Sequence, residues 1–160
     1  MTVLKLAPCL LLLWALGTVP YGKKWRGITP LHSSRADVEA ILGTSSDTKH
    51  DWTTYQTEEA AISIRYARGL PCQSTSNSKW RVSEGIVLSI TVAPKTIIRF
   101  SDLNIDTRRY ERVPDPHSLN KAEYIDKEEG EAIAVANEEV SSFRYFGGSR
   151  DSALRCPNSL

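Results

Sequence analysis

Histidine and carboxylate side chains are the residues of this chain that could catalyse hydrolysis. The sequence has three histidines, His32, His50 and His117. Asp115 lies two residues before His117, where a carboxylate could orient an imidazole that acts as a general base. Ser33 would complete a Ser-His-Asp set on paper, but no Gly-x-Ser-x-Gly turn marks a nucleophile. A small extracytoplasmic hydrolase that uses His117 and Asp115 is therefore the alternative function.

The sequence lacks the residue spacings that are typical of metal-dependent enzymes and of glycosidases. No His-x-x-x-His or His-Glu-x-x-His pattern accompanies the histidines, so the sequence predicts no metal site and no cofactor. Three acid pairs occur where turns are expected, at Glu58-Glu59, Glu128-Glu129 and Glu138-Glu139. Adjacent residues on a strand point to opposite faces, which is poor geometry for two carboxylates that must flank one glycosidic bond. We interpret the three pairs as solvated turn residues.

Tryptophan followed by arginine is the pattern in this chain most typical of a binding surface. Trp25 precedes Arg26, and Trp80 precedes Arg81. Tryptophan and arginine contribute much of the binding energy in many protein interfaces. The alternative is that each tryptophan packs in the core while its basic neighbour lies in water. Trp25, Arg26, Trp80 and Arg81 are the candidate contact residues.

Two of the three cysteines, Cys72 and Cys156, lie beyond the first 17 residues and predict a disulfide. In a small exported domain an even pair of cysteines is most simply a structural bond. Closing a loop of about 84 residues would stabilise the fold by about 4–5 kcal/mol on the chain-entropy model. A redox-active or metal-binding pair is the alternative, but the Cys-x-x-Cys spacing typical of such pairs is missing.

The first residues of the chain predict the export that a disulfide requires. Lys5 is followed by an apolar run over 6–19, the pattern of a secretory signal peptide. Small residues near the end of the run fit a cleavage site, so 1–17 is the expected leader and 18–160 the expected single domain. A retained membrane anchor is the alternative, although the run rises only about 21 Å as a helix against a hydrocarbon core of about 30 Å.

The length and charge balance of the expected domain limit the kinds of partner that it could bind. About 143 residues remain after the leader, which suits one small domain. Lys5 is the only one of the 20 Lys and Arg residues in the leader, so the remaining basic residues match the 19 Asp and Glu residues in number. Because nucleic-acid binders usually carry a basic surplus, we expect no nucleic acid as a partner. A membrane is expected only through an uncleaved leader.

A short helix has the clearest local signals in the domain. Ser34 fits a helix N-cap, and Asp37 lies at the capping-box position three residues later. Apolar residues at 3,4 spacing then line one face, and Gly43 fits a glycine C-cap. A helix of two to three turns is too short to be stable alone, so it must pack on a sheet.

Alternation of apolar and polar residues predicts the strands of that sheet. The predicted strands are 52–55, 62–66, 86–92 and 96–100, with a hairpin at 131–135 and 140–146. Residues 67–79 and 106–120 are predicted as polar loops. A helix followed by antiparallel strands gives an α+β fold, a short helix packed on an antiparallel sheet.

A weak internal repeat links the two halves of the chain. The residues Tyr55, Glu59 and Ile64 recur in the same order and spacing as Tyr124, Glu128 and Ile133. A duplicated strand unit is therefore a hypothesis for the sheet, with chance similarity as the alternative.

Several motifs resemble a group of short exported bacterial proteins without an assigned activity. The shared motifs are Trp25-x-Gly-Ile-x-Pro-Leu-His-Ser, Arg35-x-Asp-Val-Glu, the Leu42-Gly43 helix end and Leu154-Arg155-Cys156. At the level of fold, a helix that ends in Leu-Gly before antiparallel strands also resembles the SmpA/OmlA outer-membrane assembly lipoproteins and the β-lactamase-inhibitor-protein fold. Those modules bind other proteins, so the resemblance implies a binding role, although this chain lacks the lipoprotein cysteine expected of the SmpA type.

The sequence as a whole predicts a periplasmic or secreted protein that acts as a non-catalytic binding module. Its expected partner is an envelope or extracellular protein, a peptide or a glycan. The hydrolase named above is the second interpretation, and an envelope protein without a specific partner is the third.

Overall fold

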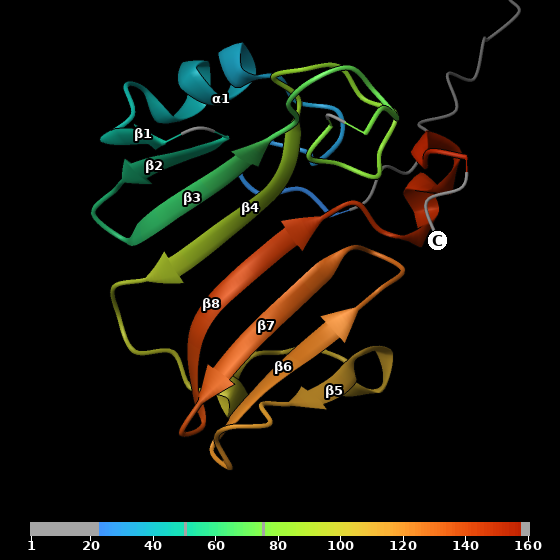
Figure 1. Ribbon diagram of the computed structural model, residues 1–160. Coiled ribbons are helices and arrows are strands. Elements are labelled where there is room, and N and C mark those ends of the chain that lie inside the picture. The colour runs from blue at the N-terminus through green and yellow to red at the C-terminus, as the bar shows by residue number, and fades with distance from the viewer. Residues whose placement is uncertain (1–22, 50, 75, 158–160) are drawn as a thin grey trace, which may run out of the picture.

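One eight-stranded antiparallel sheet forms the body of the protein (Figure 1). The computed structural model describes residues 23–49, 51–74 and 76–157, and the predicted leader lies outside them. The order across the sheet is β1-β2-β3-β4-β8-β7-β6-β5. The strands are β1 Asp47–Lys49, β2 Trp52–Gln56, β3 Ala60–Tyr66, β4 Val87–Pro94, β5 Glu111–Pro114, β6 Lys121–Asp126, β7 Glu131–Ala136 and β8 Glu139–Phe146. The helices are α1 Arg35–Leu42 and the 3-10 helices η1 Phe100–Asp102, η2 Thr107–Arg109 and η3 Ser149–Leu154.

The predicted α+β class is wrong, because the sheet dominates the fold. Strands and isolated bridges hold 41% of the described residues and helices 15%, so the fold is not a balance of the two. The region 106–120 was predicted as a loop, yet it contains β5, and β6 follows directly. Both strands are rich in charged side chains and β5 is fully exposed, so no apolar alternation marked them. The predicted strand at 96–100 is also wrong, since that segment makes only one isolated bridge, from Arg99 to Glu139, before it enters η1.

The predicted helix is confirmed, with its caps. The Asp37 backbone N–H donates to Ser34 Oγ at 3.2 Å, and the Ser34 backbone N–H donates to the Asp37 carboxylate at 2.7 Å. The hydrogen bonds that the Ser34 backbone N–H and the Ser34 hydroxyl donate to the carboxylate lower the pKa of Asp37 below its ordinary value. The helix ends at Gly43, whose φ of 76° favours glycine.

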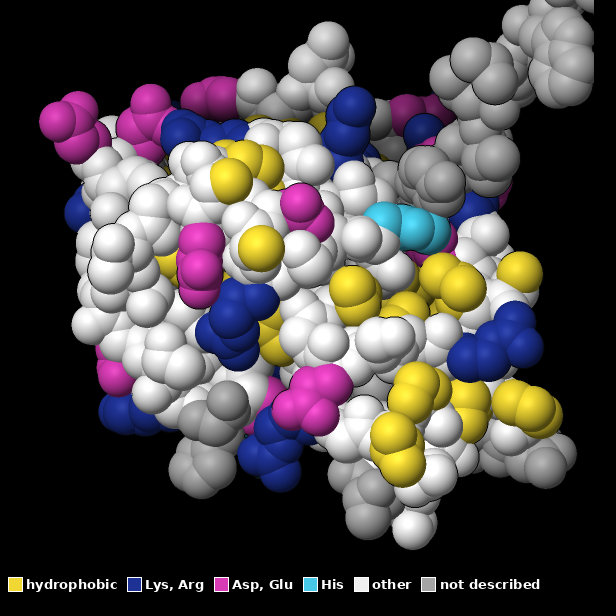
Figure 2. All heavy atoms as spheres, turned by 90° about the horizontal axis from the view of Figure 1, so that it is seen from above, with side chains coloured by type: hydrophobic (Ala, Val, Ile, Leu, Met, Phe, Trp, Pro, Cys, Tyr) yellow, Lys and Arg dark blue, Asp and Glu magenta, His cyan; other side chains and the backbone are white. Residues whose placement is uncertain are grey.

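Two apolar clusters cover one face of the sheet. In the first, Val38 of α1 and Ile28 pack against isoleucines of β3 and β4. In the second, Ile133 of β7 packs against the segment that runs from Ile98 to Tyr110. Phe143 of β8 contacts both clusters, which joins them. The view onto α1 shows basic and acidic side chains interspersed between small apolar patches (Figure 2).

The sheet consists of two consecutive four-stranded meanders. Strands β1–β4 pair with their neighbours in the chain, as do β5–β8, and the pair β4–β8 joins the two sets. The repeated Tyr, Glu and Ile residues lie at corresponding places, on β2, the β2–β3 turn and β3, and on β6, the β6–β7 turn and β7.

The predicted disulfide is confirmed. Cys72 and Cys156 are bonded, with their Cα atoms 5.3 Å apart. Such a bond fits an oxidising, extracytoplasmic compartment. Within the described ranges, no helix has the length and apolar character needed to cross a membrane.

Candidate functional site

A pocket of about 390 Å³ lies beside the disulfide-linked end of the chain. We call it the basic pocket, because arginine and lysine supply four of its lining residues. The lining consists of Arg65, Asn77, Ser78, Lys79, Trp80, Leu88, Ser89, Arg144, Phe146 and Arg155. These residues come from three strands, from the loop before Trp80 and from the segment that carries Cys156.

The sheet register builds the first wall of the basic pocket. Arg65 of β3 pairs with Ser89 of β4, and Ser89 pairs with Phe146 of β8. The three side chains therefore line up on one face, and Arg144 joins that face two residues from Phe146. Antiparallel pairing thus brings together two arginines that are far apart in the sequence.

The disulfide holds the second wall. Trp80 and Arg155 form an isolated bridge, and the Cys156 backbone N–H donates to the Lys79 carbonyl at 3.0 Å. The Arg155 guanidinium then lies 4.6 Å from the centre of the Trp80 ring, within the range of a cation–π contact. Because Cys72 tethers Cys156 next to this pairing, the disulfide fixes where Arg155 lies.

The charge of the basic pocket is one-sided. Among the described residues, its lining includes four cations and no carboxylate. Arg65 pairs with Asp51 at 3.0 Å and Arg144 with Glu123 at 2.6 Å, whereas Lys79 and Arg155 form no ion pair with any described residue. Arg144 Nε is buried and has no hydrogen-bond acceptor in the described part of the chain. Buried N–H groups normally find an acceptor, so the arrangement suits a bound anion.

A fixed amide anchors the edge of the basic pocket. Asn77 donates to Asp51 at 2.7 Å and to the Tyr66 carbonyl at 3.0 Å, and it accepts from the Arg68 backbone N–H at 2.8 Å. Burial opposes ionisation of Asp51, but the hydrogen bonds from Arg65 and Asn77 hold its pKa below the ordinary value. Asp51 is therefore a carboxylate at neutral pH and keeps Arg65 in place.

The structure separates the four predicted contact residues. Trp80 lines the basic pocket, and the neighbouring Arg81 instead donates to the Ala153 carbonyl at 3.0 Å. Trp25 packs against the first apolar cluster, as the core-packing alternative proposed. Arg26 lies 5.3 Å from the Trp25 ring centre and pairs with Glu59.

Sequence reasoning missed Arg65, Arg144, Phe146 and Arg155 as lining residues. Arg65 occupied an outward position in a correctly predicted strand, and Arg155 adjoins a predicted disulfide cysteine, so both had a usable signal. Arg144 and Phe146 had none, because only the β4–β8 register brings them to the basic pocket.

The residues of the hydrolase alternative form a turn. Asp115 Oδ1 accepts the backbone N–H of His117 at 2.8 Å, and the His117 side chain is exposed. Ser33 is buried, and its Oγ accepts the Thr29 backbone N–H at 2.9 Å. The third histidine, His50, is not among the described residues. The carboxylate thus binds the backbone of the loop, a role that explains the Asp-Pro-His sequence without catalysis.

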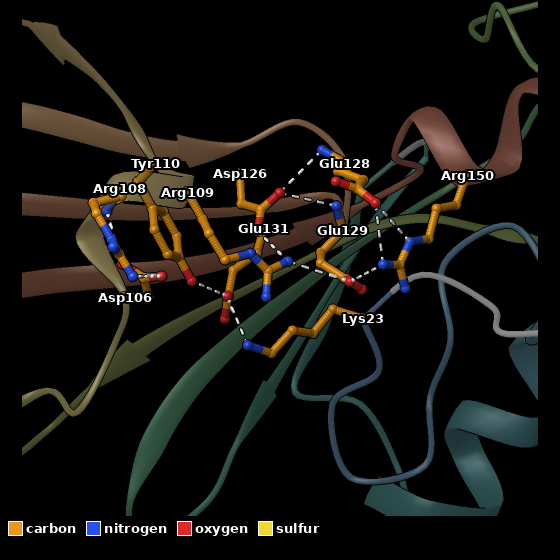
Figure 3. A network of polar contacts seen from close by, with 10 residues as sticks. All are labelled: Lys23, Asp106, Arg108, Arg109, Tyr110, Asp126, Glu128, Glu129, Glu131 and Arg150. Atoms are coloured by element: carbon orange, nitrogen blue, oxygen red, sulfur yellow. Dashed lines mark hydrogen bonds and ion pairs between the residues drawn. The ribbon is translucent and has the colours of Figure 1, made fainter.

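The acid pair of the β6–β7 turn belongs to a network of ion pairs (Figure 3). Asp126 Oδ1 accepts the backbone N–H groups of Glu128 and Glu129 at 3.0 Å each, and Arg109 lies 2.8 Å from Asp126 Oδ2. Arg150 lies 2.8 Å from the Glu129 carboxylate. Every carboxylate drawn in Figure 3 has a basic or hydroxyl partner. No cluster of described residues could hold a metal ion.

A buried glutamate of the network adds to the effect of burial on the pKa of two tyrosines. Glu131 is 5% exposed and accepts from Tyr110 Oη at 2.6 Å and from Lys23 Nζ at 2.8 Å. Burial, with the negative charge of Glu131 added, raises the pKa of Tyr145 to about 12. Burial and the hydrogen bond to Glu131 raise the pKa of Tyr110 as well. Both phenols therefore remain protonated at neutral pH.

Replacement of Asp126 by alanine tests this structural role. Asp126 is 3% exposed, and its loss would leave two turn N–H groups without an acceptor. We expect Asp126→Ala to lower the free energy of unfolding by about 2 kcal/mol, measured by urea denaturation. Asp106→Ala is the matched control, since Asp106 also accepts a backbone N–H and pairs with an arginine, but at the surface. An equal loss in both variants would contradict the role of burial.

Comparison with known proteins adds no further assignment to the basic pocket. The resemblances stated from the sequence therefore stay predictions. No protein-family model, no curated protein and no solved structure matches this chain.

Proposed function

We propose that the protein is a periplasmic or secreted, non-catalytic binding module that takes an acidic segment of a protein partner in the basic pocket. The convergence of four cations and two aromatic rings on one pocket, without a lining carboxylate, carries this proposal. Arginine side chains bind carboxylates with two parallel hydrogen bonds, and Trp80 and Phe146 offer flat apolar surfaces for a neighbouring side chain.

The lining favours a peptide over a glycan. Recognition of sugar hydroxyls needs polar groups that can donate and accept. The one amide of the pocket, Asn77, is engaged at both its oxygen and its nitrogen, and Ser78 Oγ accepts the Trp80 backbone N–H at 3.0 Å. The cations remain as the main available groups, and successive Asp or Glu side chains complement them.

The proposal is tested with a fluorescein-labelled peptide that alternates glutamate and phenylalanine. We expect the double variant Lys79→Ala and Arg155→Ala to bind about tenfold more weakly in fluorescence anisotropy, because it removes the two unpaired cations. Lys49→Ala is the matched control, since Lys49 is 79% exposed on the edge strand β1 and does not line the pocket.

Three results would overturn the proposal. The first is equal binding of a peptide with glutamine in place of glutamate. The second is unchanged affinity of the double variant. The third is tight binding of a sulfated oligosaccharide while the acidic peptide fails to bind. Crosslinking of the tagged protein in the intact envelope of its source, with the double variant beside it, would then identify the natural partner.

A further inference from the structure

A second, larger groove of about 730 Å³ lies in the β5–β8 half of the sheet and shares no residue with the basic pocket. We call it the end groove. The segment Arg99–Ser101, the loop before β6 and the β7–β8 turn form its sides. Its volume is in the range of pockets that hold small molecules.

The floor of the end groove is apolar and aromatic. The rings of Phe100 and Tyr124 stack with their centres 4.2 Å apart, and Val135 lies beside them. Leu119 stands at the rim with its side chain fully exposed, at 101% of the reference area. Removing a leucine side chain from water is favourable, so a ligand that covers Leu119 would gain affinity from this contact.

The rim of the end groove carries a net positive charge. Arg99, Arg112 and Lys121 line it, and none of them pairs with a carboxylate in 23–49, 51–74 or 76–157. Glu138 is the one lining carboxylate. The sequence did not indicate this charge, because Arg112 of β5 and Lys121 of β6 each have a glutamate within two residues.

The neighbouring glutamates are neutralised elsewhere. Glu111, next to Arg112, pairs with Lys127, and Glu123, two residues after Lys121, pairs with Arg144. The three rim cations are thus left without an internal partner. An apolar floor under unpaired cations complements a ligand that has an apolar chain and a negative head.

We propose that the end groove binds a small amphiphile with a carboxylate head and an alkyl chain. The chain lies over the Phe100–Tyr124 stack and against Leu119. The carboxylate is held by Arg99 and Arg112, which pairs with Tyr124 in the sheet and so lies on the same face as the aromatic floor. This site is independent of the basic pocket and of the partner proposed for it.

Decanoate, at concentrations where it is monomeric, is the probe that tests this proposal. In ¹H–¹⁵N spectra of the whole protein, we expect decanoate to shift the amide signals of residues 99–101 and 119–124. The double variant Arg99→Ala and Arg112→Ala should bind decanoate about fivefold more weakly. Leu119→Ser should also weaken binding, by about threefold, through the loss of apolar contact. All three residues are exposed, so the variants should keep the fold, which circular dichroism checks.

The controls separate this site from the first one. Lys79→Ala with Arg155→Ala should leave decanoate binding unchanged. Equal binding of decanol would overturn the role assigned to the cations, and unchanged affinity in the Arg99 and Arg112 double variant would do the same. Absence of shifts up to millimolar decanoate would overturn the site. Binding to phosphatidylglycerol vesicles that decanoate does not compete for would show a membrane-docking surface instead.

Discussion

Replacement of Cys72 and Cys156 by serine is expected to lower the free energy of unfolding by about 4 kcal/mol. The disulfide closes a loop of 84 residues, and its removal returns conformational entropy to the unfolded ensemble, which favours unfolding. It also tethers the segment that pairs with Lys79–Arg81. Urea denaturation of the oxidised protein and the double variant, followed by tryptophan fluorescence, measures the difference.

Reducing agent supplies the control for this experiment. Dithiothreitol should destabilise the natural chain to the level of the Cys72→Ser, Cys156→Ser variant, and it should not affect the variant. The variant should also lose affinity for the acidic peptide while still folded, since Arg155 is no longer held over Trp80. A stability change below about 1 kcal/mol would contradict the assigned contribution of the loop.

Adding a single methyl group at Gly130 is expected to destabilise the fold nearly as much as loss of the disulfide. Gly130 has a φ of 74°, and a Cβ there would overlap the carbonyl oxygen of Phe146 and lie 2.8 Å from the Gly148 nitrogen. The Phe146 N–H donates to the Gly130 carbonyl at 2.8 Å, so the two backbones cannot separate without losing this bond. We expect Gly130→Ala to lower the free energy of unfolding by about 3–4 kcal/mol, from overpacking added to backbone strain.

Gly85 provides the matched control for Gly130. It has a φ of 81°, and a Cβ built there meets no atom within 4 Å. Gly85→Ala should therefore report the backbone strain alone, about 1 kcal/mol. The difference between the two variants in urea denaturation isolates the steric overlap. If Gly85→Ala were as destabilising as Gly130→Ala, the close approach at the β6–β7 turn would not be the cause.

Local sequence signals predicted the elements whose stability is local. The capping box at Ser34 and the glycine at 43 identified α1, and strict alternation identified β3 and β4. The sequence did not predict β5 and β6. Their side chains contact solvent and ion-pair partners, so these strands are rich in charged residues and lack the apolar alternation that identifies a strand. The helix was correct as an element, yet the fold class was wrong because one short helix contributes little to a sheet of eight strands.

The candidate sites depended on long-range pairing, which no local pattern encodes. The Trp80 motif and the cysteine pair were visible in the sequence, and the structure links them through the pairing of Lys79–Arg81 with Leu154–Cys156. The basic character of both pockets was hidden, because acids and bases alternate along the chain and balance in number. Only the ion pairs show which cations are neutralised and which are not.

The pairing of β4 with β8 determines the order in which the sheet can form. Strands β1 to β4 pair only with chain neighbours, but the second side of β4 has no partner until β8, which begins at Glu139. While residues 95–138 are being synthesised, the valine- and isoleucine-rich edge of β4 can pair with any other strand. A β8 strand from a second molecule offers the same register as the chain's own. Newly made chains of this protein are therefore most prone to exchange strands at the β4–β8 pairing.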